Sequence, residues 1–272
     1  MSRAGGWIRA RWQLIAAPLL TIAVIVGAMI WSQSSGPPVS GPILNDNPAG
    51  LVEGEPYRPE IDPADFSTTI TNPYLPLIPG TSLAYEGGGE RVVVTVTGRT
   101  RQVMGVETVV VRDREWRGNA LIEDTEDWFA QDGDGNVWYF GEDTAECRDG
   151  QVTSHAGAWE AGVDGAEPGI LMLGAPQVGD TYRQEYYAGQ AEDAARVREL
   201  GATLDLGGTV YQEVLVTEDF TALEPGVLEH KFYAPEVGLI EERSIRGSGG
   251  VRLEDITVDD PGTASAGPLC QE

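Results

Sequence analysis

The sequence predicts a mainly β protein: one curved antiparallel sheet, a half-barrel or a sandwich, preceded by a single transmembrane helix. Segments rich in β-branched and aromatic residues recur along the chain, and Gly, Pro and Asp separate them. A long uncharged apolar run stands near the N-terminus. Hydrophobic residues make up 41% of the 272 residues, which is enough for a sizeable core.

The apolar run covers residues 14–31 (LIAAPLLTIAVIVGAMIW). A membrane-spanning helix needs about 17–25 such residues, whereas the core of a cleaved signal peptide has about 7–15. No A-x-A cleavage pattern follows the run. We therefore favour an uncleaved signal anchor over a cleaved signal peptide, and we expect residues 14–31 to contact the lipid bilayer.

Basic residues set the expected orientation of this anchor. Arg3, Arg9 and Arg11 precede the run, and the next basic residue is Arg58. By the positive-inside rule, residues 1–13 are cytoplasmic and the rest of the chain is extracytoplasmic. The predicted location is the plasma membrane, in single-pass topology.

The chain is strongly acidic. It carries 43 Asp and Glu against 18 Lys and Arg, for a net charge of -25. Because nucleic acid binding needs a basic surface, this balance argues against nucleic acid as a partner. It also predicts that the outer domain is repelled by anionic lipid headgroups.

Composition divides the outer part into three pieces. Residues 32–64 form a tether rich in Pro and Gly, since ten of the 17 prolines fall between positions 37 and 79. Residues 65–259 form one β domain, and residues 260–272 are a polar tail.

Nine segments within the β domain have strand composition, and turn residues join them. The segment 190–200 has helical composition, although it also fits a strand. The expected strands are 91–97, 106–112, 128–131, 137–140, 180–188, 209–217, 227–233, 239–245 and 251–258.

Several strings in the chain resemble those of known proteins: TNPYLPLIPG (71–80), EDTEDWFAQDGDGNVWYFGED (123–143), WEAGVDGAEPGI (159–170) and VGDTYRQEYYAGQAED (178–193). In them the chain resembles an uncharacterised family of exported or membrane-anchored bacterial proteins. The closing HKFYAPEVGLIEE (230–242) is similar to the last hairpin of many envelope lipoproteins with curved sheets. The resemblance implies a β fold and an envelope location. It transfers no site residue, because the family has no established activity.

One acidic stretch has the spacing of a calcium loop. Asp132, Asp134 and Asn136 occupy positions 1, 3 and 5 of that pattern, and Asp143 occupies position 12. Position 6 is Val137, where the loop needs Gly, and the flanks are strands. A hairpin turn accounts for the same residues, so we expect a plain hairpin and no cofactor, with calcium as the alternative.

The acids just upstream of this stretch have a simple interpretation. Glu123, Asp124, Glu126 and Asp127 are expected to form a solvated edge that discourages pairing between sheets.

No catalytic residue is assigned. The chain has two histidines, His155 and His230, and it contains no G-x-S-x-G, phosphate loop or dinucleotide fingerprint. Enzymatic activity is therefore ranked third, after a ligand-binding module and a domain that recognises a protein or the cell wall.

Aromatic residues gather on the predicted strands. Most are expected to fill the core. In a small barrel or half-barrel, however, inward aromatic rings line apolar ligand cavities. The candidate ligand-binding residues are Trp128, Trp138, Tyr186 and Tyr187.

Cys147 and Cys270 are the only cysteines. Two cysteines in one extracytoplasmic domain usually pair, so we expect a disulfide that pins the tail to the sheet. Two free thiols, or a bridge between molecules, are the alternatives.

These observations together predict that the protein is a non-catalytic binding module for an apolar or lipid-like ligand of the bacterial cell envelope. The alternative is a domain that uses its acidic surface to recognise an envelope protein or the cell wall.

Overall fold

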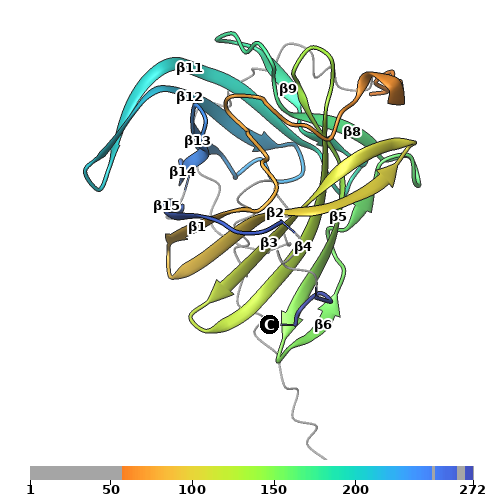
Figure 1. The fold of residues 1–272 in the computed structure, drawn as a ribbon, viewed down its shortest axis with the longest axis horizontal. Coiled ribbons are helices and arrows are strands. Elements are labelled where there is room, and N and C mark those ends of the chain that lie inside the picture. The colour runs from red at the N-terminus through yellow and green to blue at the C-terminus, as the bar shows by residue number, and fades with distance from the viewer. Residues whose placement is uncertain (1–56, 247–248, 262–266, 272) are drawn as a thin grey trace, which may run out of the picture.

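A computed structural model describes residues 57–246, 249–261 and 267–271 (Figure 1). Antiparallel strands make up almost all of this part, which confirms the predicted fold class. One short 3-10 helix, η1 (Pro63–Asp65), precedes them. The strands are β1 (Thr81–Gly87), β2 (Glu90–Val103), β3 (Val106–Arg117), β4 (Ala120–Gln131), β5 (Val137–Arg148), β6 (Gln151–Ser154), β7 (Trp159–Glu160), β8 (Glu167–Met172), β9 (Thr181–Arg183), β10 (Glu185–Tyr186), β11 (Asp193–Leu206), β12 (Thr209–Thr221), β13 (Glu229–Ala234), β14 (Gly238–Ser244) and β15 (Arg252–Val258).

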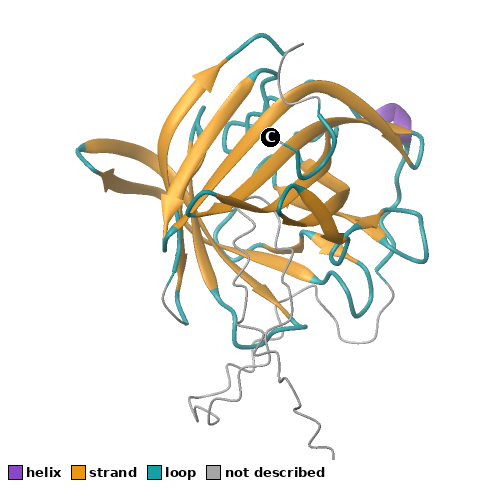
Figure 2. Cartoon of the chain, turned by 90° about the horizontal axis from the view of Figure 1, so that it is seen from below, coloured by secondary structure: helices purple, strands orange, loops and turns teal. Residues whose placement is uncertain are grey.

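The strands form one continuous sheet that curls into a nearly closed barrel (Figure 2). The order of neighbours is β10-β8-β5-β4-β3-β2-β1-β15-β14-β13-β12-β11-β9, with β6 and β7 paired to β5. The two end strands, β9 and β10, are separated in sequence by Gln184 alone. Residues 181–183 pair with β11 and residues 185–186 pair with β8, so one short stretch of chain forms the seam.

Turn chemistry explains the long hairpins. Between β2 and β3, Met104 and Gly105 have φ values of 50° and 83°. A two-residue turn of this kind matches the right-handed twist of the flanking strands. Both strands are rich in valine, and Val92, Val94 and Val96, at every second position of β2, are fully buried. The β-branched pattern that predicts these strands is therefore their core face.

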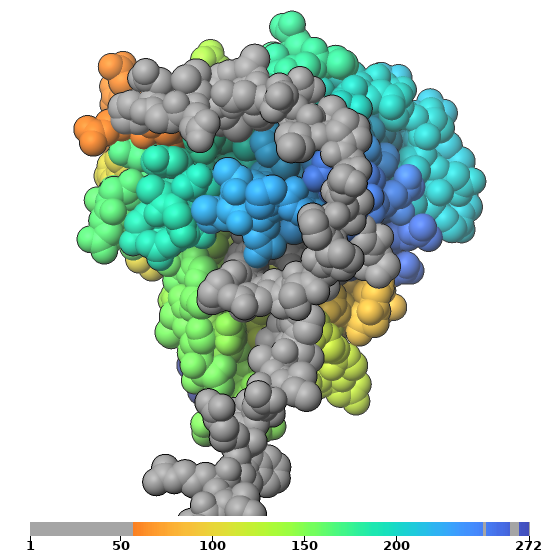
Figure 3. Space-filling model, turned by 180° about the vertical axis from the view of Figure 1, so that it is seen from behind, coloured from red at the N-terminus to blue at the C-terminus, as the bar shows by residue number. Residues whose placement is uncertain are grey.

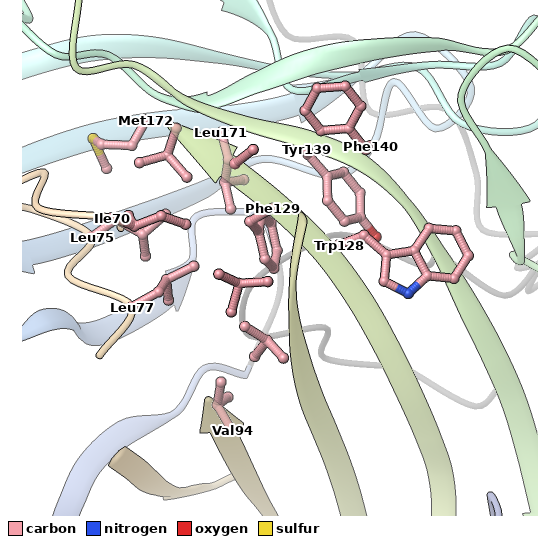
Figure 4. Close-up of a cluster of buried hydrophobic side chains, with 14 of the residues drawn as sticks. Ile70, Leu75, Leu77, Val94, Trp128, Phe129, Tyr139, Phe140, Leu171 and Met172 are labelled. Atoms are coloured by element: carbon pink, nitrogen blue, oxygen red, sulfur yellow. The ribbon is translucent and has the colours of Figure 1, made fainter. Parts of the chain in front are cut away.

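An apolar cluster fills one part of the interior. The segment 66–80 crosses the barrel before β1 and contributes Ile70, Leu75 and Leu77, each at most 5% exposed. Figure 4 shows these side chains gathered with apolar residues of β2, β4, β5 and β8, among them Phe129 and Leu171. The chain thus fills this part of the barrel with its own side chains.

The β11–β12 hairpin projects beyond the barrel (Figures 1 and 3). Its pairing contains register shifts between Val197 and Leu204. Of the segment 190–200, whose composition also fits a helix, residues 193–200 are part of β11. Asp193–Val197 and Glu199 pair with β12. Pairing with β12 therefore determines that this segment is a strand, although its local composition fits a helix as well.

Ordered contacts reach past both predicted ends of the β domain. Upstream of position 65, Ile61 packs against the core and the Tyr57 ring lies 5.6 Å from that of Tyr186. Downstream of position 259, Cys270 is 1% exposed and is disulfide-bonded to Cys147, with 5.4 Å between their Cα atoms. The described part of the predicted polar tail is therefore attached to the sheet.

The predicted anchor at residues 14–31 lies outside the described residues, as do residues 1–13 and most of the predicted tether. Within the described ranges, no helix has the length and apolar character that crossing a membrane requires.

Candidate functional site

Acidic side chains line the inner face of the sheet from β4 to β14 and surround the single lysine of the chain. We call this group the carboxylate belt. Its members are Asp127, Glu142, Glu185, Asp193, Asp219, Glu229 and Glu242, together with Lys231.

Strand register places the belt on one face, because residues directly opposite each other in an antiparallel pair lie on the same side. Tyr182, a core residue of β9, lies opposite Ala195, which continues this face into β11. Across the seam, the backbone N–H of Gln184 donates to the carbonyl oxygen of Asp193 at 2.8 Å. Ala195 lies opposite Asp219 of the belt. The opposing pairs within the belt are Asp127 with Glu142, Asp219 with Glu229, and Lys231 with Glu242.

Neutral side chains hold the carboxylates on the β5 side of the seam. The Tyr139 hydroxyl donates to Asp127 at 2.9 Å. The Thr144 hydroxyl donates to Glu142 at 2.6 Å. The Trp159 indole N–H donates to Glu185 at 3.1 Å. No ion pair links Asp127, Glu142 or Glu185 to a basic side chain of the described residues.

Burial raises the pKa of each of these carboxyl groups. Desolvation raises the pKa of Asp127 to about 7, although the hydrogen bond from Tyr139 opposes the shift. Desolvation, with added repulsion from Asp127, raises the pKa of Glu142 well above its usual range. Desolvation and repulsion from Asp193 do the same to the pKa of Glu185. This end of the belt is therefore partly protonated at neutral pH.

The other end of the belt is neutralised by Lys231. Its ammonium nitrogen lies 3.3 Å from Asp219 Oδ2 and 3.8 Å from Glu242 Oε2, and its side chain is 5% exposed. Burial lowers the pKa of Lys231, but Asp219 and Glu242 outweigh burial and hold that pKa well above its usual value. Desolvation and repulsion from Glu229 raise the pKa of Glu242 to about 8, while Lys231 opposes the shift. Desolvation raises the pKa of Asp193 to about 7 against the same opposition.

Two buried polar atoms near the seam have no hydrogen-bond partner among the described residues. They are Glu185 Oε1 and the hydroxyl oxygen of Tyr182, whose residues are 1% and 8% exposed. Asp219, Tyr233 and Lys231 all act electrostatically on Tyr182, which places its hydroxyl at the belt. Leaving such a group unpaired costs about 1–3 kcal/mol, so these atoms call for a partner that the described chain does not supply.

A polar pocket adjoins the Lys231 end of the belt. It has an empty volume of about 610 Å³, open solvent included. Glu242 belongs both to the lining of this pocket and to the belt. Its lining includes Glu86, Glu241, Glu242, Arg243, Arg252 and Glu254.

A second, apolar pocket lies between segment 66–80 and the sheet. Its empty volume is about 390 Å³, open solvent included. It is lined mainly by leucines, with Tyr85 and Tyr233 on the side toward the belt strands. None of the four predicted ligand-binding aromatic residues lines it.

Those four aromatic residues fall into two pairs, the tryptophans of β4 and β5 and the consecutive Tyr186 and Tyr187. Trp128 is 2% exposed, and the Arg101 guanidinium covers its ring at 3.9 Å. Trp138 packs against Phe66 and donates its indole N–H to Asp132 at 2.7 Å. The structure gives both tryptophans packing partners from the chain itself.

The two predicted tyrosines lie beside the seam. The Tyr186 ring contacts Tyr57, and the Arg183 guanidinium lies 4.8 Å from its centroid. Tyr187 packs against the main core. The structure therefore does not bring the four predicted residues into one site.

The calcium-loop residues form the β4–β5 turn. Asp132 accepts hydrogen bonds from the backbone N–H groups of Asp134 and Asn136, from the Asn136 amide and from the Trp138 indole, at 2.7–3.0 Å. Asp143 lies along β5, with Oδ1 3.2 Å from His155 Nδ1. Among the described residues, no three His, Cys, Asp or Glu are placed to hold a metal ion. The oxygens of Asp132 are committed to the turn.

The interpretation of the upstream acids as a solvated edge is wrong. Asp124 is 0% exposed, Asp127 is 3% and Glu123 is 8%. Both faces of β4 are covered, one by the belt interior and the other by Arg112 and the C-terminal segment. Only Glu126 keeps a partly exposed position, paired with Arg99.

The sequence analysis did not predict the carboxylate belt, although the spacing of polar residues in two strands indicates a polar sheet face. Glu123, Thr125 and Asp127 recur at every second position of β4, and Thr217, Asp219 and Thr221 do so on β12. Period-two polar residues indicate a polar sheet face, and they fit a solvated face as well as a polar interior. Barrel closure, which joins distant strands, decides between the two.

Comparison with known proteins adds fold likeness only. No protein-family model matches the chain, and no curated protein matches it. One similar solved structure is the "putative exported protein with YmcC-like fold" of Bacteroides fragilis, at 14% identity and TM-score 0.39. Another is the "putative lipoprotein" of Parabacteroides distasonis, at 7% identity and TM-score 0.36. Each match covers 68% of this chain and 98% of the other. At these scores the likeness carries no conclusion about this chain's function.

Proposed function

We propose that the protein is a non-catalytic binding module of the cell envelope, anchored by residues 14–31, that holds a ligand inside its barrel. The observation that carries this proposal is the pair of buried, unpartnered polar atoms at the belt, Glu185 Oε1 and the Tyr182 hydroxyl. Buried polar groups in folded proteins nearly always have partners, so a missing partner is best supplied by a bound molecule.

The interior favours a polar ligand over the apolar one that the sequence suggests. Ile70, Leu75 and Leu77 already occupy the apolar part of the barrel. The carboxylate belt, in contrast, has polar atoms still to be satisfied and a pocket at one end. An apolar ligand in the crevice beside Leu75 remains the competing outcome of the test.

The extracytoplasmic location is supported by the disulfide between Cys147 and Cys270. Disulfides persist in oxidising compartments and are rare in the cytosol. The non-catalytic character is supported by the position of the histidines. His155 pairs with Asp143 at a half-exposed site, and His230 pairs with Glu218, so neither takes part in the belt.

Native mass spectrometry of the full chain, extracted from membranes in mild detergent, tests the proposal. We expect a non-covalent adduct of small mass that disappears on denaturation. A chain that repeatedly carries no adduct, and that takes up neither cations nor apolar probes, contradicts it.

Protein recognition is the second candidate, and the open side of β15 favours it. Among the described residues β15 pairs with β1 along its length, but with β14 only at Arg252. No strand in the described part of the chain pairs with this side of residues 253–258, and an unpaired side of this kind accepts an added strand. The end of the β11–β12 hairpin faces it across a pocket. Crosslinking in native membranes, followed by identification of peptides linked near this edge, tests this function.

A further inference from the structure

We infer that the carboxylate belt binds an organic cation with primary ammonium groups, a linear diamine or polyamine, at Glu142, Glu185 and Asp193. This inference rests on the proposed function and assigns the chemistry of its ligand.

Lys231 shows how the belt accommodates an alkylammonium group. Its ammonium nitrogen approaches Asp219 and Glu242, and the side chain is almost fully buried. Two carboxylates and one ammonium thus coexist inside the barrel, where an unpaired charge would be costly. The contacts of Lys231 therefore show that the belt can hold a primary ammonium group between two carboxylates.

The opposite end of the belt has carboxylates without an equivalent cation. Asp127, Glu142 and Glu185 accept hydrogen bonds from the neutral groups of Tyr139, Thr144 and Trp159, respectively. Glu185 also accepts a hydrogen bond from the backbone of Asp193. A hydroxyl or an indole N–H satisfies one lone pair of a carboxylate and leaves its charge uncompensated. Within the described residues protons offset that charge, since the pKa values of all three groups are raised, and a bound cation would take the place of those protons.

Glu185 shows where that cation would sit. One carboxylate oxygen accepts from Trp159, whereas Oε1 has no partner in the described residues. The charged neighbours of Glu185 are Asp193 and Glu142. An ammonium group supplies three donors, enough for Glu185 Oε1 and these two carboxylates.

The aromatic surroundings favour an organic cation over a metal ion. The Tyr139 and Trp159 rings lie 5.2 Å apart, edge to face, beside Glu142 and Glu185. Aromatic rings next to carboxylates attract alkylammonium groups through cation–π contacts. A metal ion would need three or more converging ligands, and the described residues contain no such group.

The linear shape of the ligand follows from the shape of the belt. The belt crosses several neighbouring strands and is not gathered around one point, so a chain with amines at intervals matches it better than a compact ion.

Isothermal titration calorimetry of the full chain in mild detergent at pH 8 tests the inference, with spermidine and putrescine as probes. We expect saturable binding that is about 10-fold to 100-fold weaker in Glu185→Gln and in Glu142→Gln, because each change removes a charge-assisted contact. Glu107→Gln, an exposed carboxylate outside the belt, is the matched control and should bind as the parent does.

Thermal unfolding separates a lost site from a lost fold. Because both belt carboxyl groups are held with raised pKa values, the Gln variants should melt at the same temperature as the parent or higher. Weaker binding with unchanged melting supports the inference.

Three results overturn it: no saturable amine binding, equal binding by all variants, or displacement of the amine by Ca²⁺ at equal concentration. If neither spermidine nor putrescine binds while native mass spectrometry shows another adduct, the inference is wrong and the proposed function stands. If no adduct of any chemistry is found, both fail.

Discussion

Arg112 and Asp124 form a fully buried, two-pronged ion pair on the outer side of β3 and β4. The guanidinium donates to Asp124 through Nε at 2.7 Å and through Nη2 at 2.6 Å. It also donates to the carbonyl oxygens of Gly267 and Pro268, while the Cys270 N–H donates to Asp124 at 2.7 Å. One ion pair on the sheet is thus also the binding site of the C-terminal segment.

Arg112→Ala should destabilise the domain strongly. The change leaves Asp124 as a buried charge without its partner, which costs about 3–5 kcal/mol. Chemical denaturation of the full chain measures the effect. Arg99→Ala, which breaks the partly exposed pair with Glu126, should cost about 1 kcal/mol or less. Equal effects in the two variants would contradict the role assigned to burial.

Reduction of Cys147–Cys270 should release the tail and lower the melting temperature. The bridge joins residues 123 positions apart. For a loop of that length the chain-entropy model gives a stabilisation of about 4–5 kcal/mol. Cys147→Ser/Cys270→Ser measures it without reductant, and a non-reduced peptide map checks the pairing. Free alkylation of both cysteines in the native protein would rule the bridge out.

Gly169→Ala should open the seam. A Cβ at this position would lie 2.3 Å from the backbone carbon and oxygen of Gln184, the residue that separates β9 from β10. Such overpacking costs typically about 1–3 kcal/mol and displaces the backbone. Hydrogen exchange of β8 and β10 reports the opening. Gly226→Ala, where a Cβ meets nothing within 4 Å, is the control and should leave exchange unchanged.

Stability should fall as pH rises from 5 to 9. The pKa values of Asp127 and Asp193 are raised to about 7, and that of Glu242 to about 8. A carboxyl group whose pKa is higher in the folded state stabilises the fold at pH values below its unfolded pKa. That contribution is lost as the pH rises through the folded pKa, at about 1.4 kcal/mol per pH unit for each group.

Melting temperatures across this pH range measure the effect. Asp127→Asn should flatten the curve between pH 5 and pH 7, whereas Glu107→Gln, at an exposed site, should leave it unchanged. A melting temperature that rises steadily toward pH 9 would contradict the raised pKa values.

Residues 14–31 should be retained in the mature protein. Their apolar length fits a spanning helix better than the core of a cleaved signal peptide. The intact mass of the native protein decides the matter. A mature chain that begins between about Ser32 and Ser40, where a peptidase would cut after such a run, would identify a secreted protein instead.

The starts of several strands and one turn could be predicted from the sequence, because they depend on local residue preferences. The strands predicted at 106–112 and 137–140 begin where β3 and β5 begin, and residues 132–136 form the turn expected of them. Turn chemistry and β-branched composition act over a few residues, so the sequence displays them directly.

The candidate site depends on contacts between strands far apart in sequence. Whether Asp127 faces water or an interior depends on whether β9 and β10 meet to close the barrel, and nothing near Asp127 signals that closure. The acids of β4 were therefore misassigned to a solvated edge. The packing partners of Trp128, Trp138 and Tyr186 likewise come from distant segments, so the sequence does not display them.

The burial of Lys231 also determines how the folded protein responds to lysine-directed reagents. Position 231 is the only lysine in the chain, and its side chain is 5% exposed. A lysine-specific protease therefore has one cleavage site, which becomes accessible only when β13 leaves the sheet. Acylating reagents likewise meet no exposed side-chain amine in the native state, so the rate at which position 231 is cut or acylated directly reports the opening of the barrel.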